Sequence, residues 1–177
     1  MNLIEEKIGG TTIYNGKILS LVVDKVKLPN GSESFREIVN HNGGVSVLVV
    51  HNGKALIEKQ FRYAYKEVIY EIPAGKLEKG ENPEMAGIRE LEEECGLKAD
   101  KLKFLTCLYP TPAYTNEHLY VFFCDSFKIG RQKLDKDEFL TYDWIELETL
   151  YSMIKNGEIK DAKTVFALLA YKSGLYE

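Results

Sequence analysis

Cysteine is scarce in this chain, with three in 177 residues, and no two of them are spaced as Cys-x-x-Cys. An odd number without that spacing argues against a disulfide framework and against a thiolate zinc site. The three histidines, His41, His51 and His118, are scattered and predict neither a zinc site nor a nucleophilic triad. So few thiols fit a reducing compartment, and we expect a cytoplasmic protein.

Long apolar runs and an excess of positive charge are also missing. No stretch approaches 18 consecutive apolar residues, and residues 1–7 lack the basic start and apolar core of a secretory leader. The formal net charge of −4 argues against broad electrostatic capture of nucleic acid. The chain is 45% hydrophobic and 28% charged, which is typical of globular proteins. We therefore expect one intracellular domain, with room for a small appendage, that binds neither membrane nor nucleic acid.

Extended segments dominate on both sides of a central helix. Asn52-Gly53 predicts a two-residue hairpin turn. The tail predicts a helix over about 147–156 and another from an Asp161 cap to Lys172. This order indicates an α+β protein, or an α/β/α sandwich. Runs of β-branched and aromatic residues predict strands over 11–14, 18–28, 35–40, 44–50, 55–61, 67–72, 102–109, 119–127 and 139–145.

The central helix has clear boundaries. Asn82 suits the N-cap, Pro83 suits the first helical position, and Gly96 follows the last turn. At 100° per residue, one side of this helix gathers apolar residues and is the expected core face. Its members are Met85, Ile88, Leu91 and Cys95.

Three glutamates, Glu90, Glu93 and Glu94, gather on the other side of the helix. Like charges at this spacing cost a few tenths of a kcal/mol per pair, and Arg89 is their one obvious partner within the helix. A solvated acidic face is one interpretation. The other is a site for Mg²⁺ or Mn²⁺, since hard cations prefer carboxylate oxygens. Gly87 favours the second interpretation, because close approach of a ligand is a common reason for glycine inside a helix.

Residues 75–97 read GKLEKGENPEMAGIRELEEECGL. This segment resembles the Nudix box, G-x5-E-x7-R-E-U-x-E-E-x-G-U with U aliphatic, and matches it at every fixed position. Segments 36–39, 60–63, 70–75 and 109–114 are similar to the ADP-ribose pyrophosphatase branch of that family. Within the last of them, Pro112 lies fifteen residues beyond Leu97, where that branch has a proline.

The resemblance implies a Nudix-type α/β/α sandwich with a mixed sheet, and hydrolysis of ADP-ribose to AMP and ribose 5-phosphate. It implies Mg²⁺ or Mn²⁺ as cofactor, held by Glu90, Glu94 and the Ala74 carbonyl. It assigns Glu93 to the same catalytic group and gives Arg89 the task of orienting these carboxylates. Pyrophosphatase activity on another nucleotide sugar, such as GDP-mannose, is an alternative, as is a non-catalytic module that senses nucleotides. The intact glutamates argue against the last.

Outside the box, the resemblance points to a substrate-binding group that consists of Arg36, Arg62, Glu71 and Pro112. For the two arginines, contact with phosphate or terminal ribose competes with purely structural ion pairs, such as Arg62 with Glu71. The branch also supplies a catalytic acidic residue from a late loop. Glu138 is the expected residue here, although Asp135 and Asp137 lie within reach of the same position.

The N-terminal segment reads as additional strands before the core. We expect residues 1–40 to form a strand extension and residues 41–177 to form the hydrolase domain. The resembling branch forms homodimers by exchanging such extensions, so that both partners contribute to each substrate pocket. We therefore expect a homodimer that binds a small nucleotide-sugar substrate.

Overall fold

The structure is a computed structural model that describes residues 2–175. It divides into two compact units. The first contains the chain up to Gly43 together with Tyr109–His118. The second contains Gly44–Leu108 and the chain from Leu119 onward.

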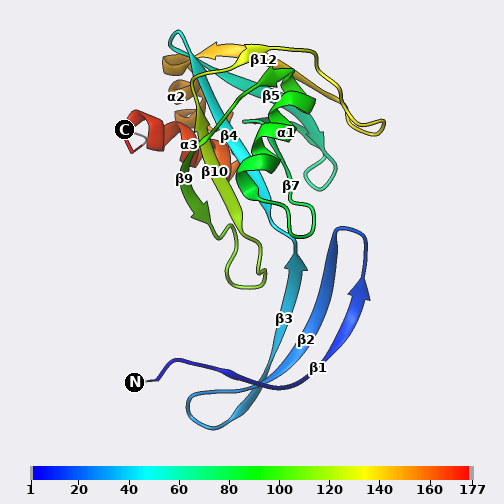
Figure 1. The fold of residues 1–177 in the computed structure, drawn as a ribbon. Coiled ribbons are helices and arrows are strands. Elements are labelled where there is room, and N and C mark those ends of the chain that lie inside the picture. The colour runs from blue at the N-terminus through cyan, green and yellow to red at the C-terminus, as the bar shows by residue number, and fades with distance from the viewer. Residues whose placement is uncertain (1, 176–177) are drawn as a thin grey trace. The chain divides into compact units, whose positions relative to one another are not determined.

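The first unit is built on a three-stranded antiparallel sheet in the order β1-β2-β3, coloured blue in Figure 1. Its strands are β1 (Glu6–Asn15), β2 (Leu19–Lys27) and β3 (Glu33–His41). β1 begins five residues before the predicted strand, because pairing with β2 continues as far as Glu6 opposite Lys27. The segment 109–118 joins this unit through a bridge between Val39 and Thr115.

The apolar side chains of the first unit are mostly uncovered. Among its described residues, Val26 is the one apolar side chain that is buried. Ile13 and Phe35 are 59% and 64% exposed. A sheet of three strands needs a packed apolar face to be stable in water, and this unit does not bury one within a single chain.

The second unit contains a mixed sheet of seven strands. The path β12-β5-β4-β10-β9 has β6 attached to β5 and β7 attached to β4. β4 and β10 run parallel and the other pairs are antiparallel. The strands are β4 (Gly44–His51), β5 (Lys54–Arg62), β6 (Glu67–Glu71), β7 (Ala74–Lys76), β9 (Lys103–Leu108), β10 (Leu119–Cys124) and β12 (Leu140–Glu146), while β8 (Leu97–Lys98) and β11 (Lys128–Ile129) pair separately.

Three helices cover the two faces of this sheet (Figure 1). Alternate residues of β4 face opposite sides, so Val47 packs with α1 (Pro83–Cys95) while Leu48 packs with α2 (Leu147–Lys155) and α3 (Ala162–Lys172). The predicted α/β/α sandwich with a mixed sheet is therefore confirmed. Within the described residues no helix is long and apolar enough to cross a membrane.

The hairpin turn and both ends of α1 lie where the sequence predicts them. Asn52 and Gly53 form the hairpin turn with φ of 50° and 76°. The Asn82 side chain accepts from the backbone N–H groups of Glu84 and Met85, so it is the N-cap of α1. Gly96 ends that helix in the left-handed conformation, with φ 65°.

The predicted core face of α1 needs a correction. Leu91 and Cys95 are buried, but Met85 is 59% exposed and Ala86 is buried in its place. The reason is Gly87, where an added Cβ would lie 2.7 Å from the Leu102 side chain. Gly87 therefore allows the helix to pack closely, and this packing, not the approach of a ligand, explains the glycine.

Candidate active site

The site is built on the segment Glu71–Gly75, where the chain changes its pairing partner. β6 pairs with β5 up to Glu71, and β7 pairs with β4 from Ala74. Between them, the Pro73 carbonyl accepts from the backbone N–H of Val47 at 2.9 Å. The Ala74 N–H turns the other way and donates to the Glu94 carboxyl at 3.0 Å. This change of partner brings the backbone at 74 beside α1.

Glu90 packs directly against the same backbone. A Cβ built on Gly75 would lie 1.9 Å from the Glu90 Oε1 atom, so no side chain fits at this position. The glycine is needed here for close approach, because it leaves space for a carboxylate. Glu90 and Glu94 therefore border one short piece of backbone, Ala74–Gly75.

Arg89 links three carboxylates through its guanidinium group. Nε and Nη2 donate to the two oxygens of Glu81 at 3.0 and 3.1 Å. Nη1 donates to Glu90 at 2.9 Å and to Glu93 at 3.0 Å. The hydrogen bonds to Arg89 lower the pKa of Glu81, and the pKa of Arg89 is raised in return.

Burial and mutual repulsion act on the remaining carboxyls. Burial, followed by the charges of Glu58, Glu90 and Glu138, raises the pKa of Glu94 to about 10, against the hydrogen bond from Ala74. Burial also raises the pKa of Glu90, although Arg89 opposes it. The site thus gathers acidic groups whose protonated forms are favoured by burial and by their mutual repulsion.

Glu58 on β5 is a member of this cluster that the sequence reasoning missed. It is 3% exposed and accepts a hydrogen bond from the Cys95 thiol at 3.0 Å. Burial raises its pKa to about 7, with a further increase from the charge of Glu71. The signal was present in the sequence, because alternation along the strand puts Glu58 on the same face as Leu56, which is also buried.

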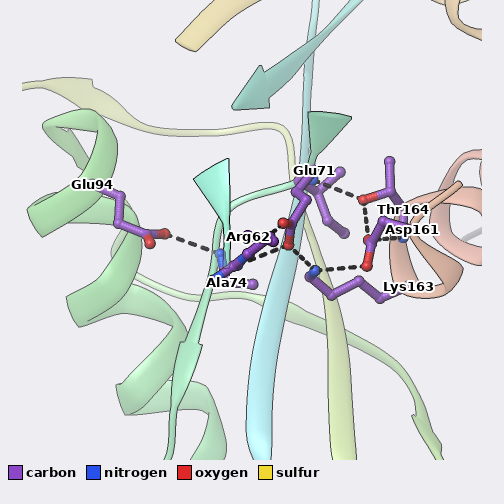
Figure 2. Close-up of polar contacts among 8 residues, drawn as sticks. Arg62, Glu71, Ala74, Glu94, Asp161, Lys163 and Thr164 are labelled. Carbon is purple, nitrogen blue, oxygen red and sulfur yellow. Dashed lines mark hydrogen bonds and ion pairs between the residues drawn. The ribbon is translucent and has the colours of Figure 1, made fainter. Parts of the chain in front are cut away.

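A second polar network lies beside the first and is drawn in Figure 2. Arg62 Nε donates to Glu71 Oε1 at 2.5 Å, and Nη2 donates to Oε2 at 2.9 Å. Lys163, on α3, forms a very short contact with the same Oε2 atom and an ion pair with Asp161 at 3.0 Å. Burial alone would raise the pKa of Glu71, but Arg62 and Lys163 together lower it. Sequence reasoning raised the Arg62–Glu71 pair but missed Lys163.

The loop that carries Glu138 follows β11 and is hydrogen-bonded to the end of α1. The backbone carbonyls of Glu93, Glu94 and Gly96 accept hydrogen bonds from this loop. From this anchor, Glu138 comes close enough to raise the pKa of Glu58, Glu90 and Glu94 through its charge. Asp135 and Asp137 are exposed. The donors are the N–H groups of Gly130 and Lys133 and the Gln132 side-chain amide.

Two predicted substrate residues belong to the first unit. Arg36 donates from Nε and Nη2 to the Glu5 carboxylate, at 2.9 and 2.5 Å, and from Nη1 to the Phe35 carbonyl. Pro112 is exposed in the segment between β9 and β10. Arg36, its contacts and Pro112 all lie within the first unit.

The donor set fits a hard divalent cation. Glu90, Glu94 and the backbone at Ala74–Gly75 supply oxygen atoms in one place, and repulsion among the buried carboxyls would be relieved by positive charge. Within residues 2–175, no three His, Cys, Asp or Glu side chains are already gathered around one point. Arg89 and the Ala74 N–H hold the carboxyls instead, and both contacts would rearrange around an ion.

Comparison with known proteins agrees with this geometry. The NUDIX domain matches residues 40–168. An ADP-ribose pyrophosphatase of Bacillus subtilis (strain 168) is 44% identical over 172 residues, covering 95% of this chain and 93% of that protein. A methanol dehydrogenase activator of Bacillus methanolicus is 42% identical over 170 residues, covering 94% and 92%. A crystal structure of an ADP compounds hydrolase superposes with a TM-score of 0.88 at 18% identity, covering 99% of this chain and 96% of that one.

A three-layered sandwich with a glutamate-rich helix against a glycine-containing loop defines a class of hydrolases that generally use divalent metal ions. The chain belongs to the Nudix family.

Proposed function

We propose that this protein is a pyrophosphohydrolase that cleaves ADP-ribose to AMP and ribose 5-phosphate with the help of Mg²⁺ or Mn²⁺. The observation that carries the proposal is the position of Glu90 and Glu94 against the Ala74–Gly75 backbone, within a complete Nudix box. The substrate is suggested by the name of the relative from Bacillus subtilis, an ADP-ribose pyrophosphatase that is 44% identical to this chain over 93% of its own length.

The metal would be held by Glu90, Glu94 and the Ala74 carbonyl, with Glu93 beside them. When bound, the ion would neutralise charge on the phosphoryl oxygens and lower the pKa of the attacking water. Arg89 would keep the carboxylates in place through its three ion pairs. Gly75 would leave the space that Glu90 occupies.

Glu138 would take a proton from the attacking water as the phosphoanhydride bond breaks. Its proximity to the carboxylate cluster supports this role over Asp135 or Asp137, which are exposed. Arg62, held by Glu71, would bind an anionic part of the substrate, since arginine suits phosphate recognition. We also propose Arg36 and Pro112, which belong to the first unit, as substrate-binding residues.

We further propose that the protein acts as a cytoplasmic homodimer in which the N-terminal extension packs on a partner. The uncovered apolar side chains of β1 and β3 support the dimer. The free thiols at Cys95, Cys107 and Cys124 support a reducing compartment.

A substrate panel tests the reaction. Release of phosphate, coupled to a phosphatase, would be measured with ADP-ribose, GDP-mannose, diadenosine polyphosphates and NADH, each with Mg²⁺, Mn²⁺ or EDTA. We expect kcat/KM to be highest for ADP-ribose and activity to vanish in EDTA. A preference for GDP-mannose of about tenfold or more would support the alternative nucleotide sugar. Nucleotide binding without hydrolysis would support the sensing module.

A further inference from the structure

Lys163 is the more buried of the two cations in the network drawn in Figure 2. Its side chain is 11% exposed, whereas that of Arg62 is 41% exposed and that of Glu71 is 4% exposed. Glu71 therefore lies between a buried lysine and an arginine that reaches the surface. Lys163 comes from α3, 92 residues beyond Glu71 in the chain.

The contacts show what Lys163 does to its neighbours. Glu71 uses one oxygen for Arg62 Nε and shares the other between Arg62 Nη2 and Lys163. These three contacts fix the plane of the Glu71 carboxylate. The bidentate pair with Arg62 also fixes the plane of the guanidinium group. The outer part of Arg62 remains exposed to solvent, where a substrate anion would meet it.

The charges of the network are balanced. Glu71 and Asp161 each contribute one negative charge, and Arg62 and Lys163 each contribute one positive charge. Loss of the lysine would leave one uncompensated negative charge behind Arg62. Because charge in a buried position is weakly screened, this would oppose binding of an anion at the arginine.

The lysine is itself held in place by the start of α3. Asp161 caps the helix by accepting from the Thr164 N–H at 3.0 Å and from its hydroxyl at 2.6 Å. The Thr164 hydroxyl oxygen also accepts from the buried N–H of Ile72 at 2.9 Å. The helix start is thus attached directly to the segment that carries Glu71.

From these contacts we infer that Lys163 is a positioning residue for substrate recognition. It holds Glu71 so that Arg62 faces the solvent with its positive charge available to a phosphate or carboxylate group. The inference rests on the proposed hydrolysis of a nucleotide sugar and adds to it a residue outside both the box and the substrate group.

Three variants test the inference. Lys163→Met removes the charge and keeps the length of the side chain, and Lys160→Met is the matched control, since Lys160 makes only an exposed contact with Glu67 at 3.4 Å. In Asp161→Asn/Lys163→Met the network is neutral again, and asparagine keeps the helix cap. The kcat and KM would be measured for ADP-ribose, together with the Kd for ADP-ribose in EDTA by calorimetry.

We expect Lys163→Met to raise KM and Kd about tenfold and to change kcat less than about threefold. Lys160→Met should leave all three within about twofold, and the double variant should recover most of the lost affinity. An unchanged Kd in Lys163→Met would overturn the inference, as would a double variant as weak as the single one. If Lys163→Met does not fold, the double variant and Lys163→Arg give the same comparison.

A second measurement does not depend on the substrate. The Arg62 Nε–H is hydrogen-bonded to Glu71, so NMR of the arginine side chains should show slow exchange of this proton in the wild type and fast exchange in Lys163→Met. Equal exchange in both would contradict the positioning role. If the wild type neither binds nor cleaves ADP-ribose, the proposed function fails, and the exchange measurement still judges the role of Lys163.

Discussion

Three glutamates, Glu58, Glu71 and Glu94, are buried to 3% exposure or less. Their surroundings shift the pKa of Glu71 in one direction and those of Glu58 and Glu94 in the other. Two cations hold Glu71, and its pKa is lowered. Among residues 2–175, Glu58 accepts from the Cys95 thiol and Glu94 from the Ala74 backbone N–H, with no cation paired to either, and the pKa values of both carboxyls are raised. Glutamate is therefore a structural anion at position 71, whereas at positions 58 and 94 its protonated form is favoured.

Glu94→Gln should separate stability from activity. Glutamine resembles the protonated glutamic acid that the buried position favours, so we expect the metal-free variant to melt no lower than the wild type. Turnover with Mg²⁺ should fall by at least about 10²-fold, since a ligand that stabilises charge in the transition state is lost. Calorimetry and the phosphate assay measure the two effects. Near-normal hydrolysis by the folded variant would remove Glu94 from the metal site.

The stability of the metal-free protein should depend on pH. Glu58 titrates near pH 7 when folded but near its ordinary pKa of 4.5 when unfolded, so between these values the folded state holds the extra proton. The free energy of unfolding should therefore decrease as pH rises from about 5 to about 7, by about 1.4 kcal/mol per pH unit for each extra proton.

Urea unfolding in EDTA at several pH values measures this slope. Glu58→Gln should reduce the slope, and added Mg²⁺ should stabilise more at pH 8 than at pH 5, because ligands must be deprotonated to bind metal. A slope that is the same in Glu58→Gln and the wild type would assign the titration to another group.

At the scale of elements, the loop after β11 uses the end of α1 as its support. Gln132 and the neighbouring backbone satisfy three carbonyls of that helix end, which have no partner inside the helix. Gly96 permits this contact, because a Cβ there would lie 2.6 Å from the Gln132 nitrogen. The carboxylates of α1 and the loop acid Glu138 are thus carried by one connected structure.

Glu138→Gln tests the role of the loop. We expect kcat to fall strongly while KM changes little, because a group that accepts a proton in the transition state contributes little to substrate binding. Asp135→Asn and Asp137→Asn are matched controls on the same loop and should have milder effects. Activity of Glu138→Gln equal to that of the wild type from pH 6 to 9 would assign the base elsewhere.

Local parts of this architecture could be predicted, and parts that depend on distant contacts could not. The caps of α1, the hairpin at Asn52-Gly53 and the Nudix box are encoded within short stretches of sequence. The exposure of Met85 depends on how closely the helix packs on its sheet. Lys163 meets Glu71 only because the fold brings two distant segments together, and no local pattern distinguishes it from the other lysines.

At the scale of the whole molecule, we expect the first unit to determine the state of assembly. We expect light scattering to give twice the 20.2 kDa mass of the chain, with an interface of more than about 2,000 Å². Ile13→Lys should weaken the dimer and the activity together, because it replaces an uncovered apolar side chain of β1 with a charged one. Ile129→Lys is the control, since Ile129 is 87% exposed in the second unit. An active wild-type monomer at micromolar concentration would contradict the proposal.

The hydrogen bond from Ile72 to Thr164 has a consequence for the order of folding. Ile72 precedes the Nudix box, but the acceptor of its buried N–H lies 92 residues later, in the last helix. During synthesis, the strands and the box helix emerge from the ribosome first, while the turn that aims Ala74 still lacks its partner. Long-range contacts of this kind form late. The newly made chain should therefore acquire its sheet before its active site, and become competent only when α3 docks.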